Sequence, residues 1–225
     1  MSPRPRTVDD TTILEAAFRV ISKIGPDRLT LADVGAEAGL SAATLVQRFG
    51  SKRELMLSIL RHLLQTVDAR FTSAMNSNES PLESLYTAAT DRIDPREDPQ
   101  MLTNRMAFYL ASLDDPEFYA LAVENPRNAL AGYKVMVERA IAAGELTAGY
   151  LDAEQLAQII HTTMSGSLLT WCVTRQGTLR GKIRRDLDLV LRPFRRGPRK
   201  ATSLSRLEEG DLPERGLSTA APAVA

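Results

Sequence analysis

The chain contains little of what disulfide-linked or membrane-spanning proteins need. Cys172 is the single cysteine among 225 residues, so no intrachain disulfide forms, which fits a reducing compartment. No apolar run approaches the length of about eighteen residues that a membrane-spanning helix needs. The polar segment that follows Met1 does not resemble a signal peptide. We therefore expect a cytoplasmic protein without a membrane partner.

Patterns typical of enzymes and metal sites are also missing. The histidines, His62 and His161, belong to no His-Glu-x-x-His motif, and the chain has no P-loop and no Gly-x-Gly-x-x-Gly fingerprint. Cys172 lies beside Trp171 in an apolar stretch, which favours a core residue over a nucleophile. We predict no catalytic residues, no metal site and no cofactor. An all-helical enzyme stays as an alternative.

Charge is balanced over the whole chain but not along it. Residues 1–72 carry ten basic and eight acidic side chains, residues 73–150 six and twelve, and residues 151–225 twelve and eight. An acidic middle between two mildly basic ends indicates segregated roles. The small positive excess of the first third gives only weak support for DNA binding, since phosphate contact needs a basic face rather than a basic chain.

The chain has helical periodicity and no alternating pattern of a strand, so we predict an all-α fold. An Asn-Ser-rich linker at residues 76–81 marks a domain boundary, and Asn125-Pro126 is expected to start a helix as N-cap and N1 proline. The predicted helices span residues 10–24, 30–38, 41–50, about 20 residues from 51, 81–93, 98–113, 117–124, 126–143, 152–176 and 180–195.

Four segments follow from this pattern. Residues 1–9 form a flexible arm, residues 10–75 a first helical domain that includes a long connecting helix, and residues 80–196 a second helical domain. The tail at 197–225 has no sustained periodicity and is expected to be disordered.

The first domain contains a helix-turn-helix signal. Its tight corner is Gly39-Leu40-Ser41, and the second helix of such a motif enters the major groove of DNA. A structural corner in a helical bundle is the other interpretation. The residues with the spacing of a small core are Val34, Ala38, Leu40, Leu45 and Phe49.

Residues 29–55 strongly resemble the N-terminal domain of the TetR family of bacterial regulators. The family pattern is approximately T-x-x-x-I-A-x-x-A-G-V-S-x-x-T-L-Y-x-H-F-x-x-K-x-x-L, and the close match covers about 45 residues. Matching positions are Thr30, Ala38, Gly39, Ser41, Thr44, Leu45, Phe49, Lys52 and Leu55. The resemblance implies an N-terminal three-helix helix-turn-helix DNA-binding domain and a C-terminal helical domain for ligand binding and dimerisation.

The residues predicted to contact DNA are Thr30, Ser41, Ala42, Ala43, Thr44, Val46, Gln47, Arg48 and Lys52. The hydroxyls of Thr30, Ser41 and Thr44 and the ammonium of Lys52 are expected to contact phosphates. The alternatives are that Thr30 and Ser41 only cap helices, and that Thr44 and Lys52 only lie on a solvated face. Short apolar side chains suit thymine methyls or close approach, and Gln47 is able to pair with adenine. Val46 replaces the usual tyrosine of the family, and Arg48 replaces its histidine. A helix-turn-helix adapter that does not bind DNA therefore stays as a second alternative.

In the family, the last two helices dimerise, and two apolar stripes in this chain suit that role. We expect them to form the seam of a homodimer, and packing inside the protomer is the alternative. The first stripe comprises Leu156, Ile160, Met164, Leu168 and Trp171, and the second Ile183, Leu187, Val190, Leu191 and Phe194.

A small-molecule effector is expected among the helices of the second domain. The candidate pocket residues are adaptable or aromatic, although each also suits ordinary core packing. They are Met101, Met106, Phe108, Tyr109, Tyr133, His161 and Met164. The sequence thus predicts a ligand-responsive dimeric regulator, a repressor released from double-stranded operator DNA by an effector that the sequence does not identify.

Overall fold

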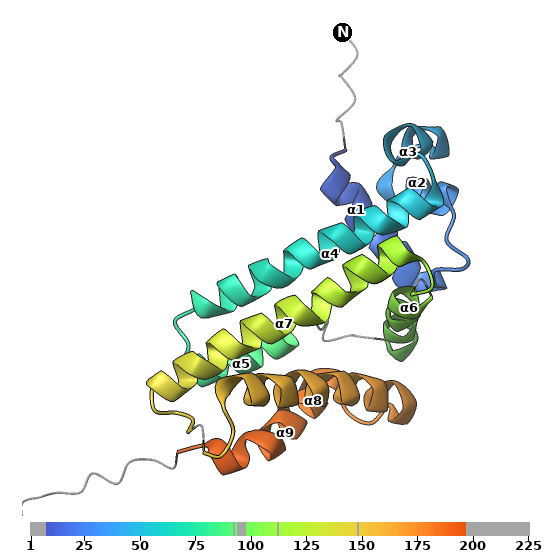
Figure 1. The fold of residues 1–225 in the computed structure, drawn as a ribbon. Helices are drawn as coiled ribbons and strands as arrows, with labels where there is room; N and C mark the ends of the chain where they lie inside the picture. Colours follow the sequence, from blue (N-terminus) through green and yellow to red (C-terminus); the bar gives the residue numbers. More distant parts are fainter. Residues whose placement is uncertain (1–7, 92, 94–97, 112, 148, 197–225) are drawn as a thin grey trace, which may run out of the picture.

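The structure, a computed structural model, describes residues 8–91, 93, 98–111, 113–147 and 149–196. Within these ranges every secondary-structure element longer than a single residue pair is a helix, and an isolated β-bridge pairs Leu146 with Arg195. The all-α prediction is confirmed (Figure 1). The helices are α1 (Asp10–Ile24), α2 (Leu31–Ala38), α3 (Ala42–Phe49), α4 (Lys52–Met75), α5 (Pro81–Thr90), α6 (Pro99–Leu110), α7 (Pro116–Ala142), α8 (Ala153–Thr174), α9 (Leu179–Leu191) and the short 3-10 helix Arg192–Phe194.

Local capping explains where these helices begin. Each of the α-helices above follows a Ser, Thr or Asp whose side chain accepts a hydrogen bond from a backbone N–H of the first turn. Thr30 and Asp33 form a complete capping box at the start of α2. No described helix has the length and apolarity that crossing a membrane requires.

One predicted helix break is wrong. Asn125-Pro126 was expected to start a new helix, but Pro126 lies inside the continuous α7. A proline inside a helix costs about 3 kcal/mol because it removes one backbone hydrogen bond and crowds the preceding turn. Both halves of α7 bury large side chains, Phe118 before the proline and Tyr133 after it. Burial of such side chains contributes roughly 1.5–3 kcal/mol each, which offsets the proline.

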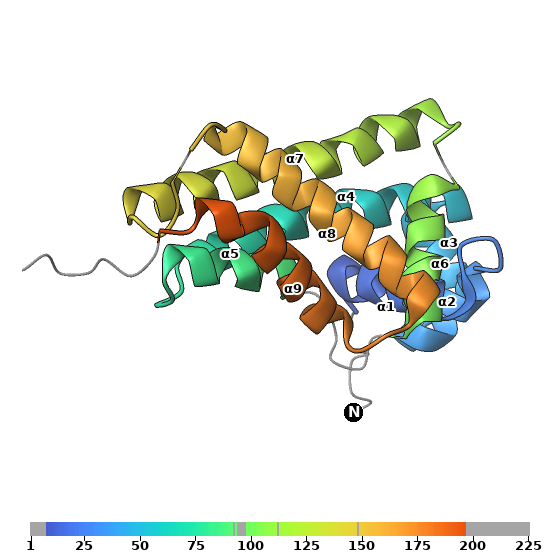
Figure 2. The ribbon, with the colours of Figure 1, turned by 90° about the horizontal axis from the view of Figure 1, so that it is seen from below.

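The buried side chains form two clusters. The first contains residues of α1 to α3 and the first half of α4, together with Phe108 from α6 and Phe118 from α7. The second begins at Val67 in α4 and contains residues of α5, α7, α8 and α9. Helix α4 therefore belongs to both clusters, and α7 runs alongside it (Figures 1 and 2).

The two predicted dimer stripes belong to the protomer. Leu156, Ile160, Ile183 and Leu187 are each 0% exposed within the single chain, so they are not available to a second copy. The prediction that these stripes form the dimer seam is wrong, because α8 and α9 use them to pack against each other, α5 and α7. The exposed apolar side chains of α8 and α9 lie on other faces and are Leu169, Val173 and Leu189.

Candidate DNA interface and ligand pocket

The corner between α2 and α3 depends on two glycines. Gly39 ends α2 in the left-handed region, with a φ of 70°, where a side chain is strained. A Cβ on Gly35 would lie 2.7 Å from the carbonyl oxygen of Leu40, so only glycine lets the turn pack against α2. Val34 and Leu45 are fully buried behind this corner. The sequence therefore folds into a compact helix-turn-helix that holds α3 at the surface.

The outward face of α3 carries several of the predicted DNA-contacting residues. Ala43, Val46 and Gln47 are exposed, and Ala42 and Thr44 are half-buried. Ser41 caps the helix by accepting a hydrogen bond of 3.1 Å from the backbone N–H of Thr44, and its Oγ lies 2.8 Å from Oγ1 of Thr44. The Gln47 amide makes no side-chain hydrogen bond within the described chain. Its donors and acceptor are therefore available to a base edge.

Thr30 and Lys52 lie at the N-termini of α2 and α4. The Thr30 hydroxyl donates to Oδ2 of Asp33 at 2.6 Å, and Lys52 Nζ donates to the backbone carbonyl of Asp27 at 3.1 Å. The half-buried Lys52 is thus engaged by a backbone carbonyl and the Thr30 hydroxyl by a carboxylate. Their contact with phosphate stays a prediction.

Arg48 lies on α3 but turns toward the start of α1. Its guanidinium forms an ion pair with Asp10 and donates a hydrogen bond to the carbonyl of Val8, which leaves the side chain 26% exposed. A phosphate contact, which the sequence predicts, requires Arg48 to share or leave these partners. The structure thus gives Arg48 a second role, fixing α3 against α1.

Ion pairs also hold α2 against α1. Arg19 and Lys23 of α1 contact Glu37 of α2 at 3.0 and 2.9 Å. Hydrogen bonds from Lys23 and Arg19 lower the pKa of Glu37 below its usual value, so the carboxylate stays charged at neutral pH.

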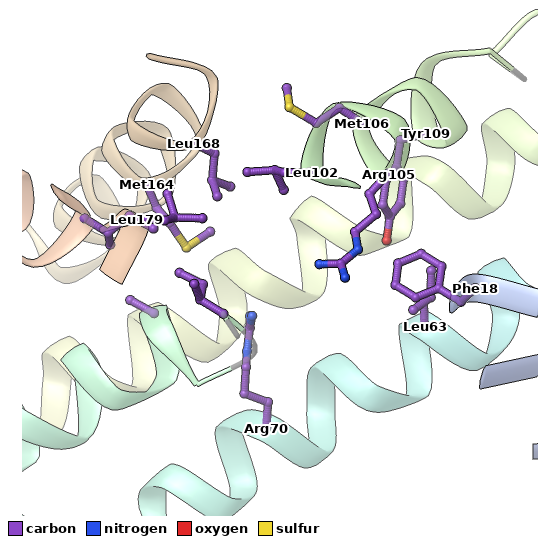
Figure 3. A pocket seen from close by; sticks show the side chains of 13 residues that line it. Phe18, Leu63, Arg70, Leu102, Arg105, Met106, Tyr109, Met164, Leu168 and Leu179 are labelled. Carbon is purple, nitrogen blue, oxygen red and sulfur yellow. The ribbon is translucent and has the colours of Figure 1, made fainter. Parts of the chain in front are cut away.

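A pocket of about 410 Å³ lies where the two core clusters meet, and we call it the junction pocket. Its walls come from α1, α4, α5, α6, α8 and α9 (Figure 3). Most of the lining is apolar, including Phe18, Leu63, Leu102, Met106, Met164 and Leu168. Because Phe18 and Leu63 also pack in the first cluster, the pocket contacts the half of the fold that contains the helix-turn-helix directly.

Two cations, Arg70 and Arg105, line the junction pocket, and no acidic side chain is among the described residues of its lining. The guanidinium of Arg70 lies 4.7 Å from the ring centre of Phe71, and its buried Nε has no hydrogen-bond partner within the described chain. Arg105 lies 5.5 Å from the ring centre of Phe18 and donates from Nε to the hydroxyl of Ser22 at 2.9 Å.

Three of the seven predicted pocket residues, Met106, Tyr109 and Met164, line the junction pocket. Met101 is half-buried and does not line it, and Phe108 lies fully buried in the first cluster. These assignments to a ligand site stay predictions.

Tyr133 and His161 lie outside the lining of the junction pocket. Burial raises the pKa of Tyr133 to about 12, and its hydroxyl donates to the sulfur of Met164 at 3.0 Å. Burial, with the positive charge of Arg70, lowers the pKa of His161, so its imidazole is mainly neutral at pH 7.

Sequence reasoning missed Arg70 and Arg105. A signal for Arg70 was available, because it follows the buried Val67 by three residues and therefore lies on the buried side of α4. Arg105 gave the same signal, because it lies three residues after Leu102 and three before Phe108, which are both buried.

Helix α6 joins the junction pocket to the end of α1. The Asn104 amide donates to the backbone carbonyl of Ser22 at 2.8 Å, and the neighbouring Arg105 contacts the hydroxyl of the same serine. Ser22 lies close to the end of α1, from which the chain turns into α2. A displacement of α6 therefore acts on the frame that holds the helix-turn-helix.

The start of α7 makes a second connection, to the first turns of α4. Arg53 donates two hydrogen bonds of 2.9 Å to Asp115, and Arg61 contacts Glu117 at 2.7 Å. Within the described ranges, no group of three or more His, Cys, Asp or Glu side chains is arranged to hold a metal ion.

The N-terminal helices match a known protein family. Residues 13–59 match the family described as bacterial regulatory proteins, tetR family. The HTH-type transcriptional regulator BetI of Agrobacterium fabrum is 31% identical over 114 residues, which are 49% of this chain and 54% of that protein. BetI of Brucella anthropi is 34% identical over 73 residues, 32% of this chain and 38% of that protein. The chain thus aligns with about half, or less, of the length of these relatives.

Solved structures extend the likeness to the whole fold. SmeT, the repressor of the Stenotrophomonas maltophilia multidrug efflux pump SmeDEF, has a TM-score of 0.61 at 21% identity and covers 92% of this chain and 98% of its own. The SmeT–triclosan complex has a TM-score of 0.64 at 23% identity, over 92% of this chain and 100% of its own. A protein from Saccharomonospora viridis in complex with choline has a TM-score of 0.67 at 19% identity and covers 83% of this chain and 97% of its own.

The fold and the exposed α3 define an all-helical helix-turn-helix protein. Its residues 13–59 match the tetR family of bacterial regulatory proteins, and its whole fold is similar to that of solved regulators.

Proposed function

We propose that this chain is a cytoplasmic DNA-binding transcriptional regulator, a repressor that a small molecule releases from its operator. Residues 10–75 would form the DNA-binding domain, and residues 80–196 the domain for effector binding and dimerisation. The observation that carries the proposal is the position of the junction pocket, whose wall includes Phe18 of α1 and Leu63 of α4. A ligand there touches the same helices that support α3. In this role the chain catalyses no reaction.

On DNA, α3 enters the major groove with its exposed face toward the bases. Gln47 offers an amide that fits adenine, and Val46, which is 49% exposed, offers an apolar surface to a thymine methyl. Lys52 at the start of α4 and the N-terminus of α3 suit the flanking phosphates. The loss of the usual tyrosine at Val46 changes which base is preferred there, and the rest of the contact face remains.

Release of DNA follows from the link between α6 and Ser22. A ligand that repositions α6 acts on the bonds from Asn104 and Arg105 to Ser22, and through them on α1. Each such hydrogen bond contributes about 0.5–1.5 kcal/mol, and two of them reach the 1–3 kcal/mol that is typical of allosteric coupling. DNA and ligand would then favour different arrangements of the same helices.

The dimer would form through the outward faces of α8 and α9. Leu169 is 55%, Val173 77% and Leu189 60% exposed in the single chain, which is unusual for large apolar side chains. Gly166 on α8 has no atom within 4 Å of the position of a Cβ, so a partner helix can approach closely there. Two copies related by a two-fold axis present two α3 helices to two half-sites.

Fluorescence anisotropy measures the affinity of the full chain for the promoter region of its own gene. The affinity for an unrelated duplex of equal length is measured for comparison. We expect the promoter to bind more tightly, and Gln47→Ala to change the preference at one position of each half-site. Gln65→Ala, an exposed glutamine on α4, is the matched control and should leave binding unchanged. Equal binding to both duplexes would instead support the adapter without specific DNA binding.

A further inference from the structure

We propose that the junction pocket takes an amphipathic organic anion, a carboxylate with an apolar body, and that its charged end pairs with Arg70. The inference rests on the proposed function, because it names the chemical class of the effector.

Arg70 is the first reason. An arginine stays charged at any physiological pH, and its planar fork of donors matches the two oxygens of a carboxylate. Its Nε is buried without a hydrogen-bond partner in the described chain, and the guanidinium packs on the ring of Phe71. The described chain offers the guanidinium no acceptor, so an anion that enters the pocket can pair with the part of the guanidinium that lines it.

The charge of the lining is the second reason. Arg70 brings a positive charge to the pocket, and no carboxylate is among the described residues of the lining. A quaternary ammonium ligand needs acidic groups or open aromatic faces. The guanidinium of Arg105 already lies over the ring of Phe18, so this aromatic face is covered by a cation. The pocket therefore disfavours a cationic ligand and favours an anionic one.

The remaining wall defines the body of the ligand. Leu102, Met106, Met164 and Leu168 provide an apolar surface, and Figure 3 shows Arg70 rising from α4 on the side opposite Leu102 and Leu168. The volume of about 410 Å³ lies toward the lower end of the range of small-molecule sites, about 300–1,000 Å³. An anion with a short aliphatic or aromatic body fits this division into a charged and an apolar side.

The test compares three probes of equal chain length that differ only in the head group: octanoate, 1-octanol and octyltrimethylammonium. Binding to the full chain is measured by calorimetry at pH 7.5, without DNA. We expect octanoate to bind at least about tenfold more tightly than the other two, because a charged hydrogen-bonded pair contributes that much or more. Arg70→Met should lower the affinity for octanoate to that for octanol and leave octanol nearly unchanged.

Two further variants control the result. Arg70→Lys keeps the charge and should retain part of the preference for octanoate. Arg127→Met removes an exposed arginine of α7 and should change nothing. If Arg70→Met does not fold, the ranking of the three probes with the unchanged protein decides the question.

Equal binding of octanoate and octanol, tighter binding of the ammonium probe, or no binding of any probe would overturn the inference. Unchanged octanoate affinity in a folded Arg70→Met would do the same. Promoter binding is measured separately, so a regulator with another effector class is distinguished from a ligand-binding protein that does not recognise DNA.

Discussion

A close contact between α4 and α7 makes Gly132→Ala a sharp test of the packing. Gly132 lies on α7 opposite Phe71 of α4, and a Cβ there would lie 2.4 Å from two ring carbons. Carbon atoms in contact normally lie about 3.5–4.0 Å apart, so the ring or the helices must move by about 1 Å. The Phe71 ring is buried and packs edge-on against the Tyr133 ring, with 4.9 Å between the two ring centres, which leaves it little room.

Two effects of opposite sign decide the outcome. Alanine in place of glycine inside a helix stabilises by about 1 kcal/mol, whereas overpacking a core costs about 1–3 kcal/mol. Because the contact is with a confined ring, we expect the steric cost to lie at the upper end of the range given for overpacking. The net loss in the free energy of unfolding should then be about 1–2 kcal/mol.

Urea unfolding followed by far-ultraviolet circular dichroism measures this loss, at one fixed protein concentration because dimerisation shifts apparent stability. Phe71→Leu provides the reference background, since it removes the ring that Gly132→Ala would strike. In that background the alanine should be neutral or stabilising, and the double-mutant cycle should show a coupling of about 1–3 kcal/mol. A Gly132→Ala protein as stable as the unchanged chain would refute the packing of α4 against α7 described above.

The remaining predictions concern DNA and assembly. Lys52→Ala should weaken binding to all DNA sequences alike and lower the salt dependence by about one unit, since a phosphate contact releases a counterion without reading bases. An unchanged salt slope in anisotropy titrations would assign Lys52 to its bond with the Asp27 carbonyl alone. Leu169→Glu should give a folded monomer in analytical ultracentrifugation, because it places a charge in the proposed dimer face. Leu110→Glu, on a leucine of α6 that is even more exposed, should stay dimeric, and an intact dimer in both variants would place the interface elsewhere.

The features that the sequence by itself determined are local. Thr30, Ser41 and Ser51 each cap a helix through a bond to a backbone group three residues away, so the pattern of residues was sufficient to place those helix starts. The same holds for Gly39, whose left-handed backbone ends α2 within the motif. The helix-turn-helix and the all-α class were therefore predictable, because their causes lie within a few residues of their effects.

Tertiary structure alone decided the rest. Pro126 stays inside α7 because the parts of this helix before and after the proline are both buried against helices that are distant in sequence. A rule based on neighbouring residues does not include the free energy of that burial. The apolar stripes of α8 and α9 fit a dimer seam or a protomer core equally well, and only the packing of α5 and α7 against them showed that Leu187 is internal. Arg70 became part of a pocket because α6, α8 and α9 close around it. Burial depends on contacts between segments far apart in the chain, and these contacts exist only once the helices have packed.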